Sequence, residues 1–302
     1  METLNTITQG TFLKNEAMAH HTSYGIGGPA KAYVIPMDKF DLAHILQCAN
    51  KHHIATYFVG SGSNLLVADE GIDGLVITLG KSFNQLKING TTVFAQSGVM
   101  LGKMVKECIH RNLSGVESLV GVPGTLGGAL VMNAGAFGGE ISNFLKEVTV
   151  MTMDGQEKIY NPEDISFSYR HSTFPENEIV LSAAFELIQS DTITVMEKRS
   201  KASGGRKASQ PLKFRSAGSV FKNPNEGAAG YYIDQAGLKG TQIGGAEISP
   251  IHANFFVNHG EAKASDIVAL IRLARETVQD KFGIALDLEV KTLGFKPGTF
   301  DV

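Results

Sequence analysis

A segment of 22 residues, Ser118–Gly139, contains seven glycines, one proline and no charged residue. Its length approaches that of a membrane-spanning helix, but the glycines and Pro123 interrupt any continuous apolar run. Backbone with so few side chains is unstable unless something packs closely against it. The segment therefore predicts a buried, loop-rich structure that is either a glycine-lined packing surface or a surface on which a flat cofactor lies.

A second glycine-containing run, Val59–Leu65, follows a predicted strand at 56–59. Successive small residues let backbone N–H groups converge on an anion, and serine hydroxyls add donors, so the run suits a phosphate. It is neither a Walker A loop nor a dinucleotide fingerprint, because Gly-Lys-Ser/Thr is missing and Leu65 replaces the third glycine. A tight turn is the alternative. Two such segments favour a large dinucleotide-like cofactor held outside a Rossmann fold.

Composition excludes several classes of protein. The chain has 302 residues, enough for two or three domains, and a net charge of −3 without a basic cluster, so neither nucleic acid nor membrane insertion is expected. Cys48 and Cys108 form no disulfide framework and no metal spacing, which predicts no metal site and a reducing compartment. The first 25 residues lack a signal-peptide pattern, so we expect a cytoplasmic protein.

Hydrophobic periodicity predicts alternating strands and helices of an α+β protein. Asp38 is expected to cap a helix, with Asp41 completing an approximate capping box, and a helical stripe over 101–109 places Cys108 in the core. The polar stretch Glu197–Gln210, with its Ser-Gly-Gly, is expected to be a domain boundary. The remaining predictions are strands at 32–35, 75–79, 147–153, 179–184 and 286–291, and a helix from Ser265 to Gly283.

Six motifs stand out along the chain: Thr22–Ala30, Gly60–Leu65, Gly121–Ala136, Tyr169–Ser172, Ser216–Pro224 and Ala236–Gly240. The most specific are Gly-Ser-x-Phe-Lys-Asn-Pro and Gly-Leu-Lys-Gly. Together the motifs resemble those of the UDP-N-acetylenolpyruvoylglucosamine reductase (MurB) family, in its shorter variant, and the resemblance runs in consistent order from about Thr22 to Lys291. The Ser203-Gly204-Gly205 run departs from the uninterrupted helix more usual in this family.

The resemblance implies an α+β fold: an FAD-binding fold of the vanillyl-alcohol-oxidase type in two halves, plus a C-terminal α+β substrate domain. We expect the two halves at 1–84 and 85–203, and the substrate-binding domain at 204–302. It also implies the cofactors, namely non-covalent FAD and NADPH as hydride donor. The FAD-binding residues implied by the two segments are Gly60, Ser61, Gly62, Ser63, Asn64, Leu65, Gly121, Val122, Pro123, Gly124, Thr125, Gly128, Asn133 and Gly135.

The implied reaction reduces an enolpyruvyl ether on a sugar nucleotide to a lactyl ether, in bacterial peptidoglycan precursor synthesis. Hydride addition to the alkene pushes negative charge towards the carboxylate, so a cation and a proton donor are needed. A guanidinium can hold a carboxylate bidentately, which makes Arg170 the expected stabiliser. By the resemblance Ser219 is the proton donor, and Glu289, preferred over Asp287, orients the donor or the developing acid.

The expected partners are the sugar-nucleotide substrate and NADPH, bound by a monomer. Lys213, Lys222 and Asn223 are expected to bind the diphosphate or the sugar, with Arg206 as a further cation and His252 and Asn254 lining the same cleft. Two other functions stay open. One is an FAD-dependent oxidase of alcohols or sugar lactones on the same fold, and the other is a non-catalytic binder of flavin or sugar nucleotide.

Overall fold

The structure is a computed structural model that describes residues 1–302 and forms two compact units. Unit 1 comprises Met1–Lys14, Ala32–Ser61 and Gly74–Arg206, and unit 2 comprises Asn15–Lys31, Gly62–Asp73 and Lys207–Val302. The three functional domains expected from the sequence stay a prediction, because a division by contacts assigns no function to either unit.

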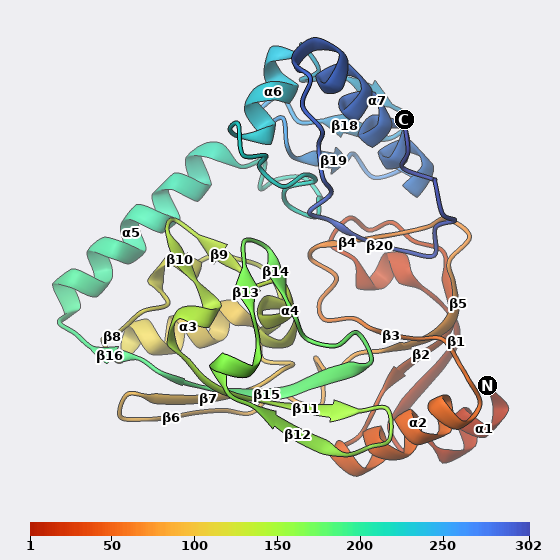
Figure 1. Cartoon of the computed structure of the whole chain (residues 1–302), viewed down its shortest axis with the longest axis vertical. Coiled ribbons are helices and arrows are strands. Elements are labelled where there is room, and N and C mark those ends of the chain that lie inside the picture. Colours follow the sequence, from red (N-terminus) through yellow and green to blue (C-terminus); the bar gives the residue numbers. More distant parts are fainter. The chain divides into compact units, whose positions relative to one another are not determined.

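A five-stranded antiparallel sheet of order β12-β11-β15-β7-β6 dominates unit 1 (Figure 1). Alternate residues of its strands, such as Val148 and Val150 of β11 and Val93 and Ala95 of β7, are buried on one face. The strands are β6 (Leu86–Asn89), β7 (Thr92–Gln96), β11 (Leu145–Thr152), β12 (Glu157–Tyr160) and β15 (Glu178–Glu186). The predicted strands at 147–153 and 179–184 are confirmed.

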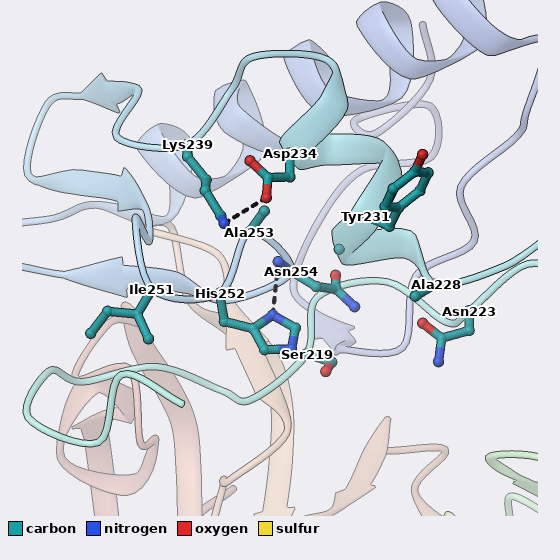
Figure 2. Close-up of a pocket in the computed structure, with 11 residues that line it drawn as sticks. Ser219, Asn223, Ala228, Tyr231, Asp234, Lys239, Ile251, His252, Ala253 and Asn254 are labelled. Atoms are coloured by element: carbon teal, nitrogen blue, oxygen red, sulfur yellow. Dashed lines mark hydrogen bonds and ion pairs between the residues drawn. The ribbon is translucent and has the colours of Figure 1, made fainter. Parts of the chain in front are cut away.

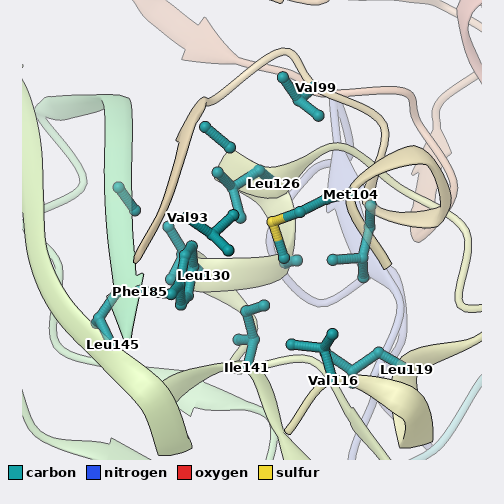
Figure 3. Packing of buried hydrophobic residues seen from close by; sticks show 14 of the residues in the cluster. Val93, Val99, Met104, Val116, Leu119, Leu126, Leu130, Ile141, Leu145 and Phe185 are labelled. Atoms are coloured by element: carbon teal, nitrogen blue, oxygen red, sulfur yellow. The ribbon is translucent and has the colours of Figure 1, made fainter. Parts of the chain in front are cut away.

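The larger core of unit 1 lies between this sheet face and two helices, α3 (Leu101–His110) and α4 (Leu126–Val131). Figure 3 shows Met104 of α3 and Leu126 and Leu130 of α4 packed close to Val93 and Phe185 of the sheet. The predicted stripe on α3 is confirmed, and Cys108 is fully buried in it. No sequence signal predicted α4, because Gly127 and Gly128 fall in its first turn.

A second sheet, of order β1-β2-β5-β3, packs with α2 (Lys39–Lys51) around a smaller core in unit 1. Its strands are β1 (Thr11–Ala17), β2 (Pro29–Ile35), β3 (Thr56–Phe58) and β5 (Ile72–Ile77); β1, β2 and β5 each continue across a unit boundary. The three strands predicted in this region are confirmed. Asp38 caps α2 as predicted, accepting hydrogen bonds from the backbone N–H groups of Phe40 and Asp41.

The expected capping box of α2 is wrong in its second half. The buried carboxylate of Asp41 does not bond the N–H of Asp38; it accepts hydrogen bonds from the backbone N–H groups of Met37, Gly10 and Gln9 at 2.8, 2.9 and 3.0 Å. Three backbone donors from two segments satisfy this carboxylate. Asp41 therefore fixes the path of the chain between α1 (Glu2–Ile7) and β1.

The polar stretch Glu197–Gln210, which was expected to be a domain boundary, is helical, since α5 spans Thr192–Ser209. Gly204 and Gly205 lie in its last turns although glycine has a low helix propensity, and Gly204 is exposed with open space around it. A Cβ on Gly205 would lie 2.9 Å from the ring of Phe137, an exposed side chain, so this part of the helix lies close to the end of the glycine-rich segment. The division between the two units does fall inside this helix, after Arg206.

Short elements complete unit 1. Its small antiparallel pairs are β8 (Leu113–Ser114) with β16 (Ile188–Gln189), β9 (Gly135–Ala136) with β10 (Gly139–Glu140), and β13 (Phe167–Ser168) with β14 (His171–Ser172). Its single-turn 3₁₀ helices are Glu117–Leu119, Ile141–Phe144 and Pro162–Asp164. These elements position the glycine-rich segment and Arg170, described below.

Unit 2 is built on α7 (Ala264–Phe282), which packs with α6 (Ala229–Gln235) and an antiparallel sheet of order β17-β18-β19 around one core. The helix is confirmed and ends, as predicted, at Gly283 in the left-handed conformation. The strands are β17 (Gln242–Ile243), β18 (Ala246–Ile248) and β19 (Phe256–Asn258), with β4 (Leu65–Val67) parallel to β20 (Lys291–Leu293) and a 3₁₀ turn at Met18–His21. No helix in the chain is both long and apolar enough to cross a membrane.

The predicted strand at 286–291 is only partly regular. Leu286 and Val290 are buried and Asp287 is exposed, as alternation predicts, but Leu288 and Glu289 are both half-buried. Regular pairing begins at Lys291, and Leu288 before it forms an isolated bridge to Phe221. This irregular pairing brings the residues before β20 beside Ser219–Lys222.

Candidate active site

A pocket of about 320 Å³ lies in unit 2, beside α6. In the view of Figure 2, Ser219 lies on the same side as the ring of His252, Asn223 lies beside Ala228, and the paired Asp234 and Lys239 lie on the opposite side of His252 from Ser219. The lining residues are Ser219, Asn223, Ala228, Gly230, Tyr231, Asp234, Lys239, Ile251, His252, Ala253 and Asn254. The structure thus brings into one pocket four residues predicted from the sequence: Ser219, Asn223, His252 and Asn254.

Backbone pairing on both sides holds the segment that carries Ser219. On one side the N–H of Val220 donates to the carbonyl of Asn254 at 2.8 Å. On the other the N–H of Glu289 donates to the carbonyl of Val220, also at 2.8 Å. The structure therefore places Ser219 and Glu289 on adjacent stretches of backbone within unit 2. Both are half-buried.

Asn254 fixes the same segment with its side chain. Its Oδ1 accepts a hydrogen bond from the N–H of Phe221 at 2.9 Å, and its Nδ2 donates to the carbonyl of Phe221 at 2.8 Å. Asn254 is buried, so these bonds satisfy an amide that would otherwise be costly to bury. It was expected to line the cleft, and it does, but its side-chain amide is used in holding Phe221.

Hydrogen-bond donors collect around this pocket. The Oδ1 of Asn223 accepts from the N–H of Ala229 at the start of α6, which leaves its Nδ2 to donate. Lys239 pairs with Asp234 at 2.6 Å, and Tyr231 presents a largely exposed ring. A pocket of this kind suits a ligand rich in oxygen acceptors, such as a phosphate or a sugar. Tyr231 and Asp234 were missed from the sequence, whereas Lys239 lay inside the quoted Gly-Leu-Lys-Gly motif.

Lys213 and Lys222 do not line the pocket. Lys213 is exposed, and Lys222 is half-buried with its N–H bonded to the carbonyl of Asp287 at 2.8 Å. Their expected role in substrate binding stays a prediction.

Within unit 1 the two glycine-containing segments meet. Thr125 Oγ1 occupies the space that a Cβ on Gly60 would fill, and the carbonyl of Gly60 accepts a hydrogen bond from Thr78 Oγ1 at 3.4 Å. Gly121 and Gly124 both have positive φ, at 75° and 132°. A Cβ on Gly121 would also lie 3.0 Å from Cδ of Arg206. Glycine is needed at these positions for conformation or for space.

The second half of the first loop belongs to unit 2, where its residues have structural partners. Gly62 has a φ of 66° and lies against the carbonyl of His21. Asn64 Nδ2 donates to the carbonyl of Glu289 at 3.0 Å, and Leu65 is buried in β4. The expected contacts of these residues with a cofactor stay predictions. The side chain of Asn64 also holds the backbone at Glu289 through its hydrogen bond.

Two buried polar atoms in unit 1 fit a bound cofactor. Ser61 Oγ and Asn133 Oδ1 have no hydrogen-bond partner, although Asn133 Nδ2 donates to Glu140 Oε2 at 2.8 Å and to the carbonyl of Ser168 at 3.1 Å. Buried polar groups are normally satisfied, so each such atom marks a place for a ligand group or a water. Together with the close backbone approach at Gly60, these atoms fit FAD, which offers ring N–H donors and phosphate oxygens.

Arg170 lies in unit 1, at the two-residue turn between β13 and β14, with a positive φ of 55°. Its guanidinium carbon lies 4.8 Å from the ring centroid of Tyr169. A Cβ on Gly135 would lie 3.5 Å from Arg170 Nη1, so this side chain reaches the glycine-rich segment. Burial, and then the charge of Arg170, lower the pKa of Arg206 below its usual value. The charges of Arg170 and Arg206 therefore influence each other within unit 1.

Comparison with known proteins agrees with this architecture. The profile of the FAD binding domain matches residues 30–159, and that of the UDP-N-acetylenolpyruvoylglucosamine reductase C-terminal domain matches residues 210–293. The crystal structure of UDP-N-acetylenolpyruvylglucosamine reductase from Thermus caldophilus superposes with a TM-score of 0.82 at 34% identity, covering 95% of this chain and 99% of that one. The expected α+β fold with an FAD-binding domain is confirmed.

Sequence relatives give the same result over almost the whole chain. The UDP-N-acetylenolpyruvoylglucosamine reductase of Halalkalibacterium halodurans is 39% identical over 295 residues, covering 97% of this chain and 98% of the relative. That of Latilactobacillus sakei is 41% identical over 283 residues, covering 93% of each chain. With both domain profiles matched in order, the chain is a flavoenzyme that belongs to the UDP-N-acetylenolpyruvoylglucosamine reductase family.

Proposed function

We propose that the protein reduces the enolpyruvyl ether of UDP-N-acetylglucosamine-enolpyruvate to UDP-N-acetylmuramate, with NADPH as the source of electrons. The observation that carries this proposal is the position of Ser219, in one pocket with the donors Asn223, Tyr231 and Lys239. That combination provides a proton donor beside a surface suited to a sugar nucleotide. Family membership supports the same reaction.

FAD is the implied redox cofactor, and when bound it supplies the hydride that adds to the terminal alkene carbon. The residues proposed to hold it in unit 1 include Gly60, Ser61, Thr125 and Asn133, because they combine close backbone approach with unsatisfied polar atoms. The charge-free backbone of Ser118–Gly139 lets an aromatic ring lie flat against it.

Three side chains are proposed to act on the substrate. The Arg170 guanidinium holds the substrate carboxylate and stabilises the negative charge that grows there. The Ser219 hydroxyl gives its proton to the carbon that bears the carboxylate, and the resulting alkoxide recovers a proton from solvent or a neighbouring group. Glu289, held beside Val220, orients this proton donor. Each proton and electron pair is then accounted for, with one hydride and one proton added across the double bond.

Spectroscopy of the purified protein tests the proposal. We expect a flavin spectrum that bleaches with NADPH under anaerobic conditions and returns on addition of the enolpyruvyl sugar nucleotide. A colourless protein that cannot take up FAD would contradict the proposal, because the proposed reaction requires bound FAD. Flavin that is reduced by NADPH but not reoxidised by this substrate would favour the alternative of an oxidase on the same fold.

The proposal also covers the oligomeric state of the enzyme and the compartment in which it works. We propose that it acts as a monomer in the cytoplasm, where UDP-linked sugars and NADPH are available. Light scattering during size-exclusion chromatography, with and without FAD, gives the mass in solution. A mass twice that of the 32.3 kDa chain would contradict the monomer.

A further inference from the structure

We infer that Glu140 is a positioning residue for Arg170, on which it acts through the buried amide of Asn133. The inference rests on the proposed function, in which the Arg170 guanidinium holds the substrate carboxylate. It adds to that function a residue that lies outside the sequence motifs described above. All three residues belong to unit 1.

The side chain of Asn133 joins Glu140 to the hairpin that carries Arg170. Its Nδ2 donates to Glu140 Oε2 at 2.8 Å and to the backbone carbonyl of Ser168 at 3.1 Å. An amide nitrogen has two hydrogens, so both are used, and two acceptors at this nitrogen determine which way the amide is turned. Asn133 is fully buried, where an unused donor is costly. The carboxylate of Glu140 therefore fixes the amide that holds Ser168.

The hairpin that presents Arg170 is short and needs support from its surroundings. β13 and β14 contribute two residues each, and Arg170 in the turn between them has a φ of 55°. An isolated hairpin is at best marginally stable, and a non-glycine residue at positive φ is held there by its neighbours. In β13, Ser168 accepts from Asn133. In β14, the hydroxyl of Ser172 donates to the carbonyl of Val131 at 2.7 Å. Each strand is thus tied by a hydrogen bond to the region where α4 ends.

Glu140 and Arg170 also approach the same glycine. Gly135 of β9 pairs with Glu140 of β10 in antiparallel register. A Cβ on Gly135 would lie 3.0 Å from Cγ of Glu140 and 3.5 Å from Nη1 of Arg170. In Figure 1 the β9–β10 and β13–β14 hairpins lie near each other, with α4 beside them. Both side chains use the space that the glycine leaves, so the position of one limits the position of the other.

The exact position of Arg170 matters for its proposed role. A guanidinium binds a carboxylate at two points when its plane is turned towards that group. Stabilisation of growing negative charge depends on a donor that is already in place, and a misplacement of about 1 Å can lower a rate ~100-fold. Glu140 is therefore expected to affect ligands that carry the carboxylate, and not the nucleotide part of the substrate.

Two variants at position 140 separate the reach of the side chain from its charge. Glu140→Gln keeps the length and an oxygen that can accept from Asn133, but it loses the charge. Glu140→Asp keeps the charge but is one methylene shorter, so it loses this hydrogen bond. The variants are compared with wild type by calorimetry on oxidised, FAD-loaded protein and by rapid mixing of the reduced protein with the enolpyruvyl substrate.

The calorimetric ligands are UDP-N-acetylglucosamine-enolpyruvate and UDP-N-acetylglucosamine, which lacks the carboxylate. We expect Glu140→Asp to raise the Kd of the first ligand roughly 3- to 10-fold, the loss of one hydrogen bond, and to leave that of the second within about 2-fold. Flavin reoxidation should slow at least about 10-fold in Glu140→Asp. Glu140→Gln should stay within about 3-fold of wild type in each measurement.

A double-mutant cycle with Arg170→Ala tests whether Glu140 acts through Arg170. Once the guanidinium is absent, Glu140→Asp should change the reoxidation rate by less than about 2-fold, because residues that act through one another are not additive. Slowing of the same size with and without the guanidinium would overturn the inference, since Glu140 would then act independently of Arg170.

The remaining outcomes separate the inference from the proposed function. Equal slowing in Glu140→Gln and Glu140→Asp would overturn the inference, because charge and not the bond to Asn133 would then matter. Equal weakening of both ligands, or loss of bound flavin in Glu140→Asp, would also overturn it, since Glu140 would then support unit 1 as a whole. Wild-type protein whose reduced flavin is not reoxidised by the enolpyruvyl substrate would overturn the proposed function together with the inference, whereas an active wild type with two unaffected variants would overturn the inference alone.

Discussion

The hydroxyl of Thr125 lies where a side chain on Gly60 would begin. These two residues belong to the two glycine-containing segments, 65 positions apart in the chain. Their contact turns two separate sequence signals into one surface of unit 1. A side chain at position 60 would therefore displace Thr125 or alter the backbone that is proposed to bind FAD.

Gly60→Val should abolish or strongly weaken FAD binding. The added side chain would overlap Thr125, and overpacking of this kind costs about 1–3 kcal/mol or displaces the loop. The bound flavin per protein, read from the visible spectrum after purification, measures the effect. Gly102→Ala is the matched control, because a Cβ there meets nothing within 4 Å and lies on α3. Full flavin content in Gly60→Val would remove Gly60 from the cofactor site.

Ser219→Ala should separate the two halves of the reaction. We expect flavin content and reduction by NADPH to be unchanged, while reoxidation by the enolpyruvyl substrate slows by at least ~100-fold, the usual contribution of a proton donor. Rapid-mixing absorbance of the flavin measures both rates in one protein. Ser216→Ala, in the same motif but outside the pocket, serves as the control. An unchanged reoxidation rate would exclude Ser219 as proton donor.

Arg170→Lys should bind substrate more weakly and turn it over more slowly, by roughly 10²- to 10³-fold in kcat/KM. Lysine keeps the charge but lacks the planar fork that holds a carboxylate at two points. Steady-state kinetics with the enolpyruvyl sugar nucleotide tests this. Since Arg170 has a positive φ, thermal unfolding of the variant should be compared with that of wild type to exclude a change in the turn. Normal kinetics would return Arg170 to a purely structural role.

Asp69→Ala should destabilise the start of α7. The Asp69 carboxylate accepts hydrogen bonds from the N–H groups of Ala264 and Ser265 at 2.7 and 3.0 Å, so it caps this helix from a distant part of the chain. Loss of a helix cap costs about 0.5–2 kcal/mol. Urea unfolding gives the difference in free energy. The neighbouring Glu70→Ala removes an exposed carboxylate without such bonds, and an equal loss in both variants would show that the cap is unimportant.

Cys108 should resist alkylation in the native protein. Burial raises the pKa of its thiol to about 12, so almost no thiolate is present at pH 8. Mass spectrometry after iodoacetamide treatment should find Cys48, which is half-buried, modified before Cys108. Above about pH 9 the unfolded thiol ionises while the folded one does not, so the free energy of unfolding should fall as the pH rises. Rapid native labelling of Cys108 would contradict its burial.

Sequence reasoning succeeded where a local rule decides the structure. The stripe on α3 and the N-cap at Asp38 needed only helical spacing and one side chain, and both are confirmed. Asp41 was misjudged because its partners, Gly10 and Gln9, lie more than 30 residues away. The helix α5 was not predicted because two adjacent glycines, Gly204 and Gly205, favour a break in a helix, yet the helix continues through both.

The pocket was predictable only in part, because some of its lining residues are brought together by contacts between distant parts of the chain. Ser219 and Asn223 lie four residues apart in one motif, so their proximity follows from the sequence. Tyr231 and Asp234 carry no comparable signal, because α6 brings them to the pocket through packing. His252 was noticed in its motif, but the state of its ring depends on a bond to Asn254 that no spacing reveals.

The parallel pairing of β4 with β20 has a consequence for biosynthesis. Asn64, at the end of the Gly60 loop, bonds the carbonyl of Glu289, a residue 225 positions later in the chain. Contacts between such distant residues form late, since a long stretch of chain must be ordered before they can close. While the ribosome is still making the protein, β4 has no parallel neighbour until residues 291–293 emerge. The Gly60 loop can therefore reach its final anchorage in unit 2 only near the end of translation.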